Sequence, residues 1–320
     1  MKIIILMPVY EDWDAALELC RKIDLVLRQE KSLRVSLLLI DDGSTQSTYP
    51  EELSGCIEAM EQISVLALRR NLGHQRAIAI GLAHLQEHWS GDAVVVMDAD
   101  GEDRPEDIPK LLGAMRNAGR PTAVFAERGR RLESLTFRTL YRCYSVLHKF
   151  FTGRDIRFGN FSVFPWAHLE SLVVFPELWN NYSATFLKSR LPYIRVRCDR
   201  GPRLAGQSKM NFVSLVVHGL SALFANQEVV GTRLLLMTMV FTLALFLLIG
   251  AVVGVRIHGS LAIPDWATTT MALLFVLVGQ CLVGCFMLVF FIIMNRSQLG
   301  FLPIRDYAYF VCRETTLYAK

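Results

Sequence analysis

The sequence predicts an α/β domain built on a mostly parallel sheet, followed by a part that crosses a membrane twice. Two patterns in the 320 residues predict this. Through the first 126 residues, short apolar runs alternate with amphipathic stretches, as strands and helices do in a doubly wound sheet. Beyond residue 230, two uncharged apolar runs are each long enough to cross a bilayer as a helix.

The expected strands and helices follow one another in a regular order. In chain order, the strands are expected at 2–7, 35–40, 63–68, 93–97 and 122–126, and the helices at 13–29, 74–88 and 105–117. The last of these helices has Pro105 near its start, with Glu106 and Asp107 in its first turn. This is a typical start of a helix, because proline and acidic residues occur preferentially in the first turn.

Polar residues come directly after three of these strands. The first strand ends at Pro8-Val9-Tyr10, the second at Asp41-Asp42-Gly43-Ser44-Thr45, and the run Val94 to Met97 leads into Asp98-Ala99-Asp100. Ligands of open α/β sheets lie beyond the carboxyl ends of the strands. Two carboxylates one residue apart can share a divalent cation that holds a diphosphate. Each motif alone also fits a solvated turn, but their joint order favours a ligand site.

The C-terminal third contains two apolar runs that we interpret as transmembrane helices. Leu234 to Val255 and Ala267 to Met294 contain no charged residue. The alternative is a pair of buried helices in a soluble core. Ahead of them, Met210 to Val230 shows apolar residues at helical spacing, which fits a helix lying on the bilayer surface or an ordinary core-facing helix.

Charge around the two runs predicts their orientation. Residues 256–266 between the runs contain one arginine, whereas the C-terminal tail contains Arg296, Arg305, Arg313 and Lys320. Positive residues favour the cytoplasmic side, so we expect an integral membrane protein with two spans, the domain and both termini being cytoplasmic. The apolar stretch of residues 1–7 is too short for a signal peptide and leads straight into Pro8-Val9-Tyr10-Glu11, so we expect it to form the first strand. The expected divisions are a domain at 1–210, a juxtamembrane helix at 211–232, spans at 233–295 and a tail at 296–320.

Together these motifs resemble one known group of enzymes. The chain is similar to GT-A-fold, family 2 glycosyltransferases of the polyprenyl-phosphate type, which include dolichol-phosphate mannose synthase and bacterial two-span glucosyltransferases. The matching segments are Pro8-Val9-Tyr10-Glu11, Asp41-Asp42-Gly43-Ser44-Thr45, Asn71-Leu72-Gly73, Asp98-Ala99-Asp100, Arg128, Arg138, Gly159-Asn160-Phe161 and Arg203-Leu204-Ala205-Gly206-Gln207-Ser208-Lys209. The two spans complete the resemblance, which covers essentially the whole chain.

The resemblance implies a reaction and a set of site residues. A hexose would pass from a nucleotide-sugar to a polyprenyl phosphate on the cytoplasmic face, in a bacterial inner membrane. UDP-glucose is the first candidate donor, with GDP-mannose and UDP-N-acetylhexosamines as alternatives. The implied nucleotide-sugar residues are Pro8, Tyr10, Glu11, Asp41, Asp42 and Asp98. The implied ligands of Mg²⁺ or Mn²⁺ are Asp98 and Asp100, with Glu102 as a further candidate. The implied acceptor-phosphate residues are Arg128, Arg138, Arg203 and Lys209, and the expected catalytic residues are Asp98, Asp100, Arg128 and Arg138.

The expected chemistry needs no strong general base. A phosphate monoester has a second pKa of about 6 and is largely ionised at neutral pH. Arginines can hold this anion beside the donor through charge-assisted hydrogen bonds. Direct attack would invert the anomeric centre. Most of the basic residues at 127–157 are also explained by contact with anionic lipids. The expected partners are therefore the two substrates and the bilayer, and not nucleic acid, and the transmembrane pair is compatible with a homo-oligomer.

Several positions depart from the family pattern. Glu102 stands where the family often has an amide, and it either strengthens metal binding or is solvated. Asn160 stands where an acid is common, which disfavours a base there, and Gln207 replaces the usual acid before Ser-Lys. We expect His74 to be a surface residue at the start of a helix and not a ligand.

Three other functions compete with this interpretation. A processive polysaccharide synthase would contain more spans and a Gln-x-x-Arg-Trp element, and the sequence has neither. A catalytically inactive, membrane-anchored scaffold on the same fold is the alternative from a different class. A cation-dependent nucleotidyltransferase or pyrophosphatase is the third, and it would not need a lipid phosphate.

Overall fold

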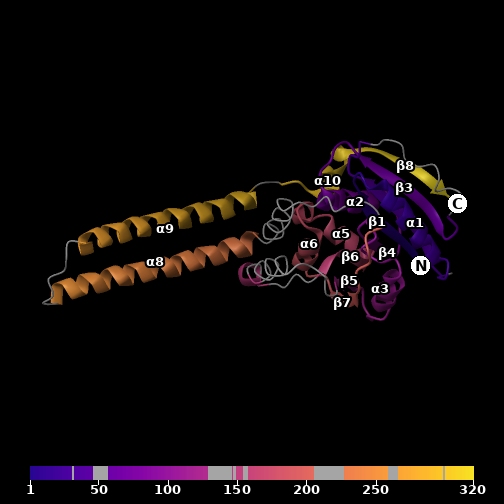
Figure 1. The fold of residues 1–320 in the computed structure, drawn as a ribbon. Coiled ribbons are helices and arrows are strands. Elements are labelled where there is room, and N and C mark those ends of the chain that lie inside the picture. Colours follow the sequence, from indigo (N-terminus) through magenta and orange to yellow (C-terminus); the bar gives the residue numbers. More distant parts are fainter. Residues whose placement is uncertain are drawn as a thin grey trace. The chain divides into compact units, whose positions relative to one another are not determined.

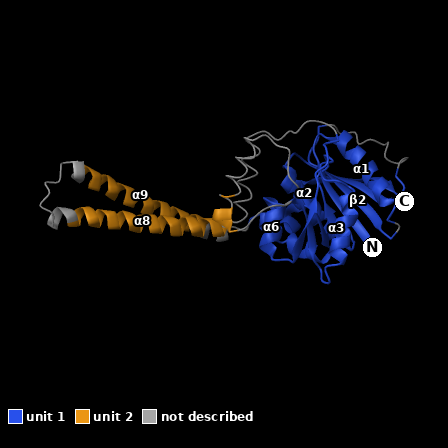
Figure 2. Ribbon diagram, turned by 60° about the horizontal axis from the view of Figure 1, so that its bottom comes forward, with its two compact units in different colours: residues 1–145, 155–225, 300–320 blue, residues 146–154, 226–299 orange. Residues whose placement is uncertain are grey.

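An eight-stranded mixed sheet organises the first of two units into which the chain divides. The computed structural model describes residues 1–30, 32–45, 57–128, 146, 149–153, 158–204, 227–258, 266–297 and 300–320. Unit 1 comprises residues 1–145, 155–225 and 300–320, and unit 2 comprises residues 146–154 and 226–299 (Figure 2). The chain therefore leaves unit 1, forms most of unit 2, and returns to unit 1 at its C-terminus.

The sheet has the strand order β7-β5-β6-β4-β1-β2-β3-β8 (Figure 1). The strands are β1 (Lys2–Val9), β2 (Arg34–Asp41), β3 (Met60–Leu68), β4 (Ala93–Val96), β5 (Ala123–Arg128), β6 (Phe158–Pro165), β7 (Tyr193–Cys198) and β8 (Val311–Ala319). The β1–β2, β1–β4, β2–β3 and β5–β7 pairs are parallel, and the pairs made by β6 and β8 are antiparallel. The predicted fold class, an α/β domain with a mostly parallel sheet, is confirmed.

Helices cover the sheet on both faces. Those expected from the sequence are α1 (Trp13–Leu27), α2 (His74–His88) and α3 (Asp107–Arg116). The remaining helices of unit 1 among the described residues are α5 (Ala167–Leu172), η2 (Pro176–Trp179), α6 (Tyr182–Ser189), α10 (Pro303–Asp306) and η3 (Tyr307–Phe310). The five predicted strands coincide with β1 to β5, to within a few residues at their ends, because their apolar runs are buried.

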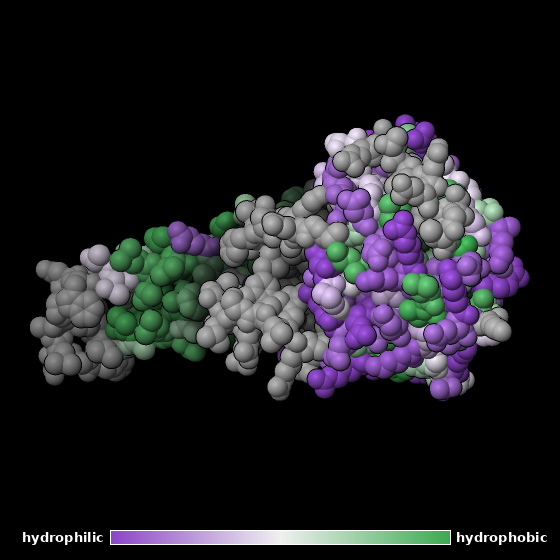
Figure 3. Space-filling model, turned by 45° about the vertical axis from the view of Figure 1, so that its right-hand side comes forward, coloured by the Kyte–Doolittle hydropathy of each residue, from purple (hydrophilic) through white to green (hydrophobic). Residues whose placement is uncertain are grey.

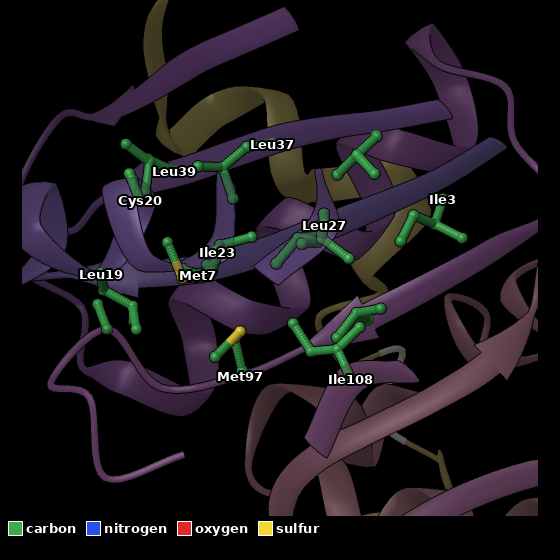
Figure 4. Close-up of a cluster of buried hydrophobic side chains, with 14 of the residues drawn as sticks. Ile3, Met7, Leu19, Cys20, Ile23, Leu27, Leu37, Leu39, Met97 and Ile108 are labelled. Atoms are coloured by element: carbon green, nitrogen blue, oxygen red, sulfur yellow. The ribbon is translucent and has the colours of Figure 1, made fainter. Parts of the chain in front are cut away.

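The central strands are apolar on both sides because each side packs on helices. Odd-numbered β1 residues such as Ile3 and Met7 belong to a buried cluster with Ile23 of α1 (Figure 4). Even-numbered residues such as Leu6 belong to a second cluster with Ile78 of α2. A strand buried on both faces reads as a continuous apolar run, which is why periodicity within β1 is hidden in the sequence.

The C-terminal strand β8, which was not predicted from the sequence, joins the sheet. It pairs antiparallel with β3 from Gln62 opposite Ala319 to Leu68 opposite Val311. The backbone N–H of Lys320 also donates to the carbonyl of Glu61 at 2.9 Å. Residues 311–319, expected only as part of a tail, thus form an edge strand of the domain.

Unit 2 contains two long apolar helices, α8 (Gln227–His258) and α9 (Trp266–Ser297). Within them, Glu228–Gly254 and Thr269–Phe291 each have a mean hydropathy of 2.6 and are long enough to span a membrane. Leu245, Ile249 and Val278 are buried between the two helices. Most other apolar side chains of α8 and α9 are exposed, and they form a continuous apolar surface on this unit (Figure 3). The core helix of a soluble protein would bury such side chains. The expected juxtamembrane helix at 211–232 lies mostly outside the described residues.

Candidate functional site

The site lies where β4, β1 and β2 end. These three strands are neighbours and parallel, so their carboxyl ends meet at one edge of the sheet. Val9 of β1 lies opposite Asp41 of β2, and β4 ends just before Asp98. The three polar motifs predicted from the sequence are therefore brought together at one edge.

The turn after β4 is held closed by its own carboxylates. The backbone N–H of Asp98 donates to Asp103 Oδ2 at 2.9 Å, and that of Glu102 donates to Asp100 Oδ1 at 3.0 Å. Gly101 has a φ of +82°, which an L-residue with a side chain rarely adopts. The side chains of Asp98 and Asp100 are 21% and 20% exposed, so a ligand can reach both. The turn is thus a preformed anionic site.

Residues 200–204, which follow β7, dock on this turn. The N–H of Gly201 donates to the carbonyl of Glu102 at 2.9 Å, and the N–H of Leu204 donates to that of Asp100 at 3.0 Å. A Cβ built on Gly101 would lie 2.3 Å from Leu204 Cγ, so only glycine permits this close approach.

Two arginines of this segment face the acids. Arg203 contacts two carboxylates, with Nη2 2.5 Å from Asp12 Oδ2 and Nη1 3.4 Å from Asp100 Oδ2. Arg200 forms an ion pair with Glu102. Burial lowers the pKa of Arg200, although Asp100 and Asp98 oppose this shift. The predicted acceptor residue Arg203 therefore lies beside the predicted metal ligand Asp100, and Glu102 is engaged by an arginine.

The end of β2 supports the loop that precedes α2. Asp42 is buried, and its two oxygens accept the N–H groups of Leu72 and Gly73, each at 2.8 Å. Burial raises the pKa of Asp42, while these two N–H groups and His74 lower it, leaving a net upward shift. Asp42 thus positions the Asn71-Leu72-Gly73 motif, and its expected contact with the nucleotide-sugar stays a prediction.

The other nucleoside-binding candidates surround the loop after β2. The Glu11 carboxylate accepts from the N–H and the hydroxyl of Thr45 at 2.6 and 2.7 Å. The N–H of Ser44 donates to Asp41 Oδ1 at 3.0 Å. Pro8 is buried in β1, and the exposed side chain of Tyr10 follows it. These contacts shape the edge on which a nucleoside is expected to bind.

His74, the first residue of α2, belongs to the acidic site. Its Nε2 lies 3.1 Å from Asp98 Oδ1 and 2.8 Å from Asn160 Nδ2. Burial lowers the pKa of this imidazole, but the Asp98 carboxylate and the neighbouring acids raise it more strongly. His74 lies at the start of a helix, as predicted, but its contact with Asp98 was not predicted from the sequence. The sequence signal for a role of His74 in the site was its position directly after the Asn71-Leu72-Gly73 motif.

Three of the expected basic residues cannot be compared with the site. Arg128 is the last residue of β5, opposite Cys198 of β7, and only its backbone is described. Arg138 and Lys209 lie outside the described residues. Conversely, Asp12 and Arg200 line the site without having been singled out from the sequence, because isolated charged residues in loops give no local signal.

The two carboxylates fit a divalent cation of the hard type. Carboxylate oxygens suit Mg²⁺ or Mn²⁺, which in phosphate-handling sites are bound by one or two carboxylates together with substrate phosphates. Among the described residues, no group of three or more His, Cys, Asp or Glu side chains is arranged to hold a metal. Asp98 and Asp100 are the residues that could hold such a cation, together with phosphate oxygens of a bound ligand.

The chain is similar to several solved structures and curated proteins. A glucosyl-3-phosphoglycerate synthase from Mycobacterium tuberculosis, solved with Mn²⁺ and UDP-glucose, is 18% identical with a TM-score of 0.49, covering 72% of this chain and 80% of that one. A mannosyltransferase from Pyrobaculum calidifontis, solved with GDP-mannose and Mn²⁺, is 16% identical with a TM-score of 0.41, covering 90% and 84%. The undecaprenyl-phosphate 4-deoxy-4-formamido-L-arabinose transferase of Salmonella choleraesuis is 34% identical over 111 residues, or 35% of this chain and 32% of that protein. The match thus spans about a third of the length of this curated relative.

The match to a family model is longer. The model of glycosyl transferase family 2 matches residues 4–168, just over half of the 320 residues. This segment runs from β1 into α5 and includes the ends of β1, β2 and β4 that form the site. The chain belongs to glycosyl transferase family 2.

Proposed function

We propose that the chain transfers a sugar from a nucleotide-sugar to a polyprenyl phosphate at the surface of a membrane. The observation behind this proposal is the meeting of Asp98, Asp100 and Arg203 at one edge of the sheet, with Arg203 Nη1 3.4 Å from Asp100 Oδ2. A reaction between two phosphate-bearing substrates needs their negative charges offset in one place. Carboxylates that bind a cation, next to an arginine, meet that need.

Two features support a lipid-phosphate acceptor. The helices α8 and α9 are long and apolar enough to cross a membrane, and they follow the segment that contains Arg203. The Salmonella relative named above is, by its name, a transferase acting on undecaprenyl phosphate. UDP-glucose stays our first candidate donor, and this name adds a nucleotide-linked 4-deoxy-4-formamido-L-arabinose to GDP-mannose and the UDP-N-acetylhexosamines.

Different residues of the site bind different parts of the two substrates in this proposal. Tyr10, Glu11 and Asp41 lie where the nucleoside is expected. A divalent cation held by Asp98 and Asp100 would stabilise the negative charge on the leaving diphosphate. Arg203 holds the acceptor phosphate and is itself oriented by Asp12.

The acceptor phosphate serves as the nucleophile without a protein base, because it is already ionised at neutral pH. Its oxygen attacks the anomeric carbon as the bond to the donor diphosphate breaks, so an α-linked donor gives a β-linked product. NMR of the lipid product measures the anomeric configuration, and a retained configuration would exclude this direct mechanism.

We also propose that the domain and both termini share the cytoplasmic side. Since β8 follows α9 and pairs with β3, the chain must return to the side it left. Two crossings satisfy this requirement and one does not. The basic residues of the C-terminal segment favour the cytoplasm for that side.

A transfer assay tests the function. Purified full-length protein receives undecaprenyl phosphate, Mg²⁺ or Mn²⁺, and each candidate donor carrying a radiolabel. We expect label to enter the lipid phase with one donor and to stay in the aqueous phase when EDTA is added or when Asp100→Ala replaces the wild type. Metal-independent transfer would contradict the cation proposed at Asp98 and Asp100.

The same assay separates the rival functions. A scaffold on an inactive transferase fold would transfer no label from any donor although the protein is folded. A nucleotidyltransferase or pyrophosphatase would release labelled products without undecaprenyl phosphate. Only a transferase needs both the donor and the lipid.

A further inference from the structure

We propose that His74 is a positioning residue, which holds the Asp98 carboxylate in the orientation that binds the divalent cation. This inference rests on the proposed function, because it assumes a cation at Asp98. It assigns a role to a histidine that the expected chemistry leaves unused. It also gives a role to Asn160, the residue that departs from the common acid of the family.

Two side-chain nitrogens, from His74 and Asn160, lie close to the same oxygen of Asp98. Asp98 Oδ1 lies 3.1 Å from His74 Nε2 and 3.3 Å from Asn160 Nδ2. His74 comes from the start of α2 and Asn160 from β6, so the two contacts approach from different elements. Two contacts of this kind limit the rotation of the carboxylate about its side-chain torsions.

Hydrogen bonds from neighbouring residues determine the orientation of the Asn160 amide. Asn160 Oδ1 accepts from Gln75 Nε2 at 3.1 Å, and Gln75 Oε1 accepts from the backbone N–H of Tyr182 at 2.8 Å. A backbone N–H can only donate, so it determines which end of the Gln75 amide faces it. That choice presents Gln75 Nε2 to Asn160, and Asn160 in turn presents its NH₂ group to Asp98.

This chain of hydrogen bonds begins at Tyr182, a residue of the core. Tyr182 is fully buried at the start of α6, and its hydroxyl lies 2.7 Å from Ser162 Oγ in β6. A buried aromatic side chain tied at its polar end has little freedom to move. Hydrogen bonds connect Tyr182 to Gln75, Gln75 to Asn160 and Asn160 to Asp98. The immobile core residue Tyr182 therefore restricts the position of the Asp98 carboxylate.

The expected consequence is a higher affinity for the cation. Groups that hydrogen-bond to metal ligands orient them, and removing one typically costs about 10- to 100-fold in metal affinity. A carboxylate released from His74 would lose one of its two orienting contacts, and the cation would have to supply part of its ordering. His74 thus acts on the cation through Asp98 and need not touch it.

The experiment measures Mn²⁺ binding to the full-length protein, using Mn²⁺ alone as the probe and its EPR signal as the readout. The variants are Asp98→Ala, His74→Ala, His74→Gln, Gln75→Leu and, as a control on the same helix, His88→Gln. His88 contacts the hydroxyl of Tyr307 at 2.9 Å and is not a site residue. Melting temperatures establish that each variant is folded.

We expect His74→Ala to weaken Mn²⁺ binding by about 10- to 100-fold. His74→Gln should restore part of the loss, since glutamine can donate to Asp98, and Gln75→Leu should show a smaller loss in the same direction. His88→Gln should bind like the wild type. Spin-echo modulation should show no ¹⁴N nucleus bound directly to Mn²⁺.

Each opposite result overturns a defined part of the proposal. Wild-type affinity in His74→Ala, with binding abolished in Asp98→Ala, would remove the role of His74 and leave the proposed function standing. A directly bound ¹⁴N that disappears in His74→Ala would make His74 a ligand. Unchanged binding in Asp98→Ala would remove the cation site itself, and both proposals with it.

Discussion

Arg203 Nη2 lies 2.5 Å from Oδ2 of Asp12, a residue 191 positions earlier in the chain. The other terminal nitrogen of the same guanidinium lies 3.4 Å from Asp100 Oδ2. One cationic side chain therefore joins the start of α1, the acidic turn after β4 and the segment after β7. The three side chains are between 18% and 24% exposed, so water screens these contacts less than it screens a surface ion pair.

Replacing Arg203 by lysine should impair the reaction although the charge is kept. A single ammonium group cannot present two nitrogens in a fixed fork to Asp12 and Asp100. Charge-assisted hydrogen bonds contribute about 1.5–3 kcal/mol, so we expect kcat/KM for the lipid acceptor to fall about 10- to 100-fold. Steady-state kinetics with each substrate varied in turn measure the effect.

The matched control is Arg195→Lys on β7. Arg195 forms a more exposed ion pair with Glu127 at 3.8 Å, and the same substitution there should leave the kinetics unchanged. Equal behaviour of the two variants would show that the geometry of Arg203 has no part in the reaction.

Gly101→Ala should loosen the segment that docks on the acidic turn. Alanine at a φ of +82° is strained, and its Cβ would meet Leu204 Cγ at 2.3 Å. Gly119 provides the control, because its φ is +69° but nothing lies within 4 Å of an added Cβ. We expect Gly119→Ala to cost about 1–2 kcal/mol of stability and Gly101→Ala to cost about 1–3 kcal/mol more.

Thermal melts of both glycine variants measure this difference, and Leu204→Ala in the Gly101→Ala background should recover part of it. Transfer activity should fall in Gly101→Ala alone, since residues 200–204 contain Arg203. Identical losses in the two single variants would show that the contact with Leu204 does not matter.

Asp24→Ala should destabilise the domain without touching the site. Asp24 of α1 is fully buried, and Oδ1 accepts from the N–H groups of Ala59 and Glu58 at 2.8 and 3.1 Å. Removing the carboxylate takes the acceptor from these part-buried donors and from the buried N–H of Met60, for an expected loss of about 2–4 kcal/mol. The melting temperature should fall by roughly 5–15 °C.

Glu18→Ala, on the same helix, is the control for Asp24→Ala. Glu18 is 47% exposed and only approaches Arg21 at 3.7 Å, so its replacement should change the melting temperature little. If both variants melt at the wild-type temperature, the hydrogen bonds of Asp24 contribute nothing net.

His84 should make stability fall as the pH falls through about 6.5, the ordinary pKa of histidine. Burial lowers the pKa of His84 more than Glu314 raises it, and Nδ1 has no hydrogen-bond partner among the described residues. Below the ordinary pKa, the unfolded chain binds a proton that the folded chain resists, so acid favours unfolding. Above this pH both states are neutral and the effect vanishes.

Melting temperatures of the wild type and His84→Gln at pH 7.5 and 5.5 test this. Glutamine keeps a donor for Glu314, which lies 2.9 Å from His84 Nε2, but does not titrate in this range. The variant should lose less stability on acidification. Parallel losses would show that His84 takes up its proton in the folded protein as well.

The sequence by itself determined the fold class, the main elements and the position of the acidic turn. Apolar runs such as residues 93–97 and 234–255 reveal buried strands and membrane-length helices because hydrophobic pattern is a local property. The acids at Asp98 and Asp100 were found because they follow such a strand directly, and parallel strands end at a common edge.

Only the tertiary structure decided which residues meet across long distances in the chain. Strand β8 pairs with β3 about 250 positions earlier, and Thr316 lies within 3.4 Å of Ser64. The contacts of Arg203 with Asp12 and of His74 with Asp98 join separate loops in the same way. Ion pairs and hydrogen bonds between distant segments leave no periodic trace in sequence, because each depends on the geometry that the whole sheet imposes.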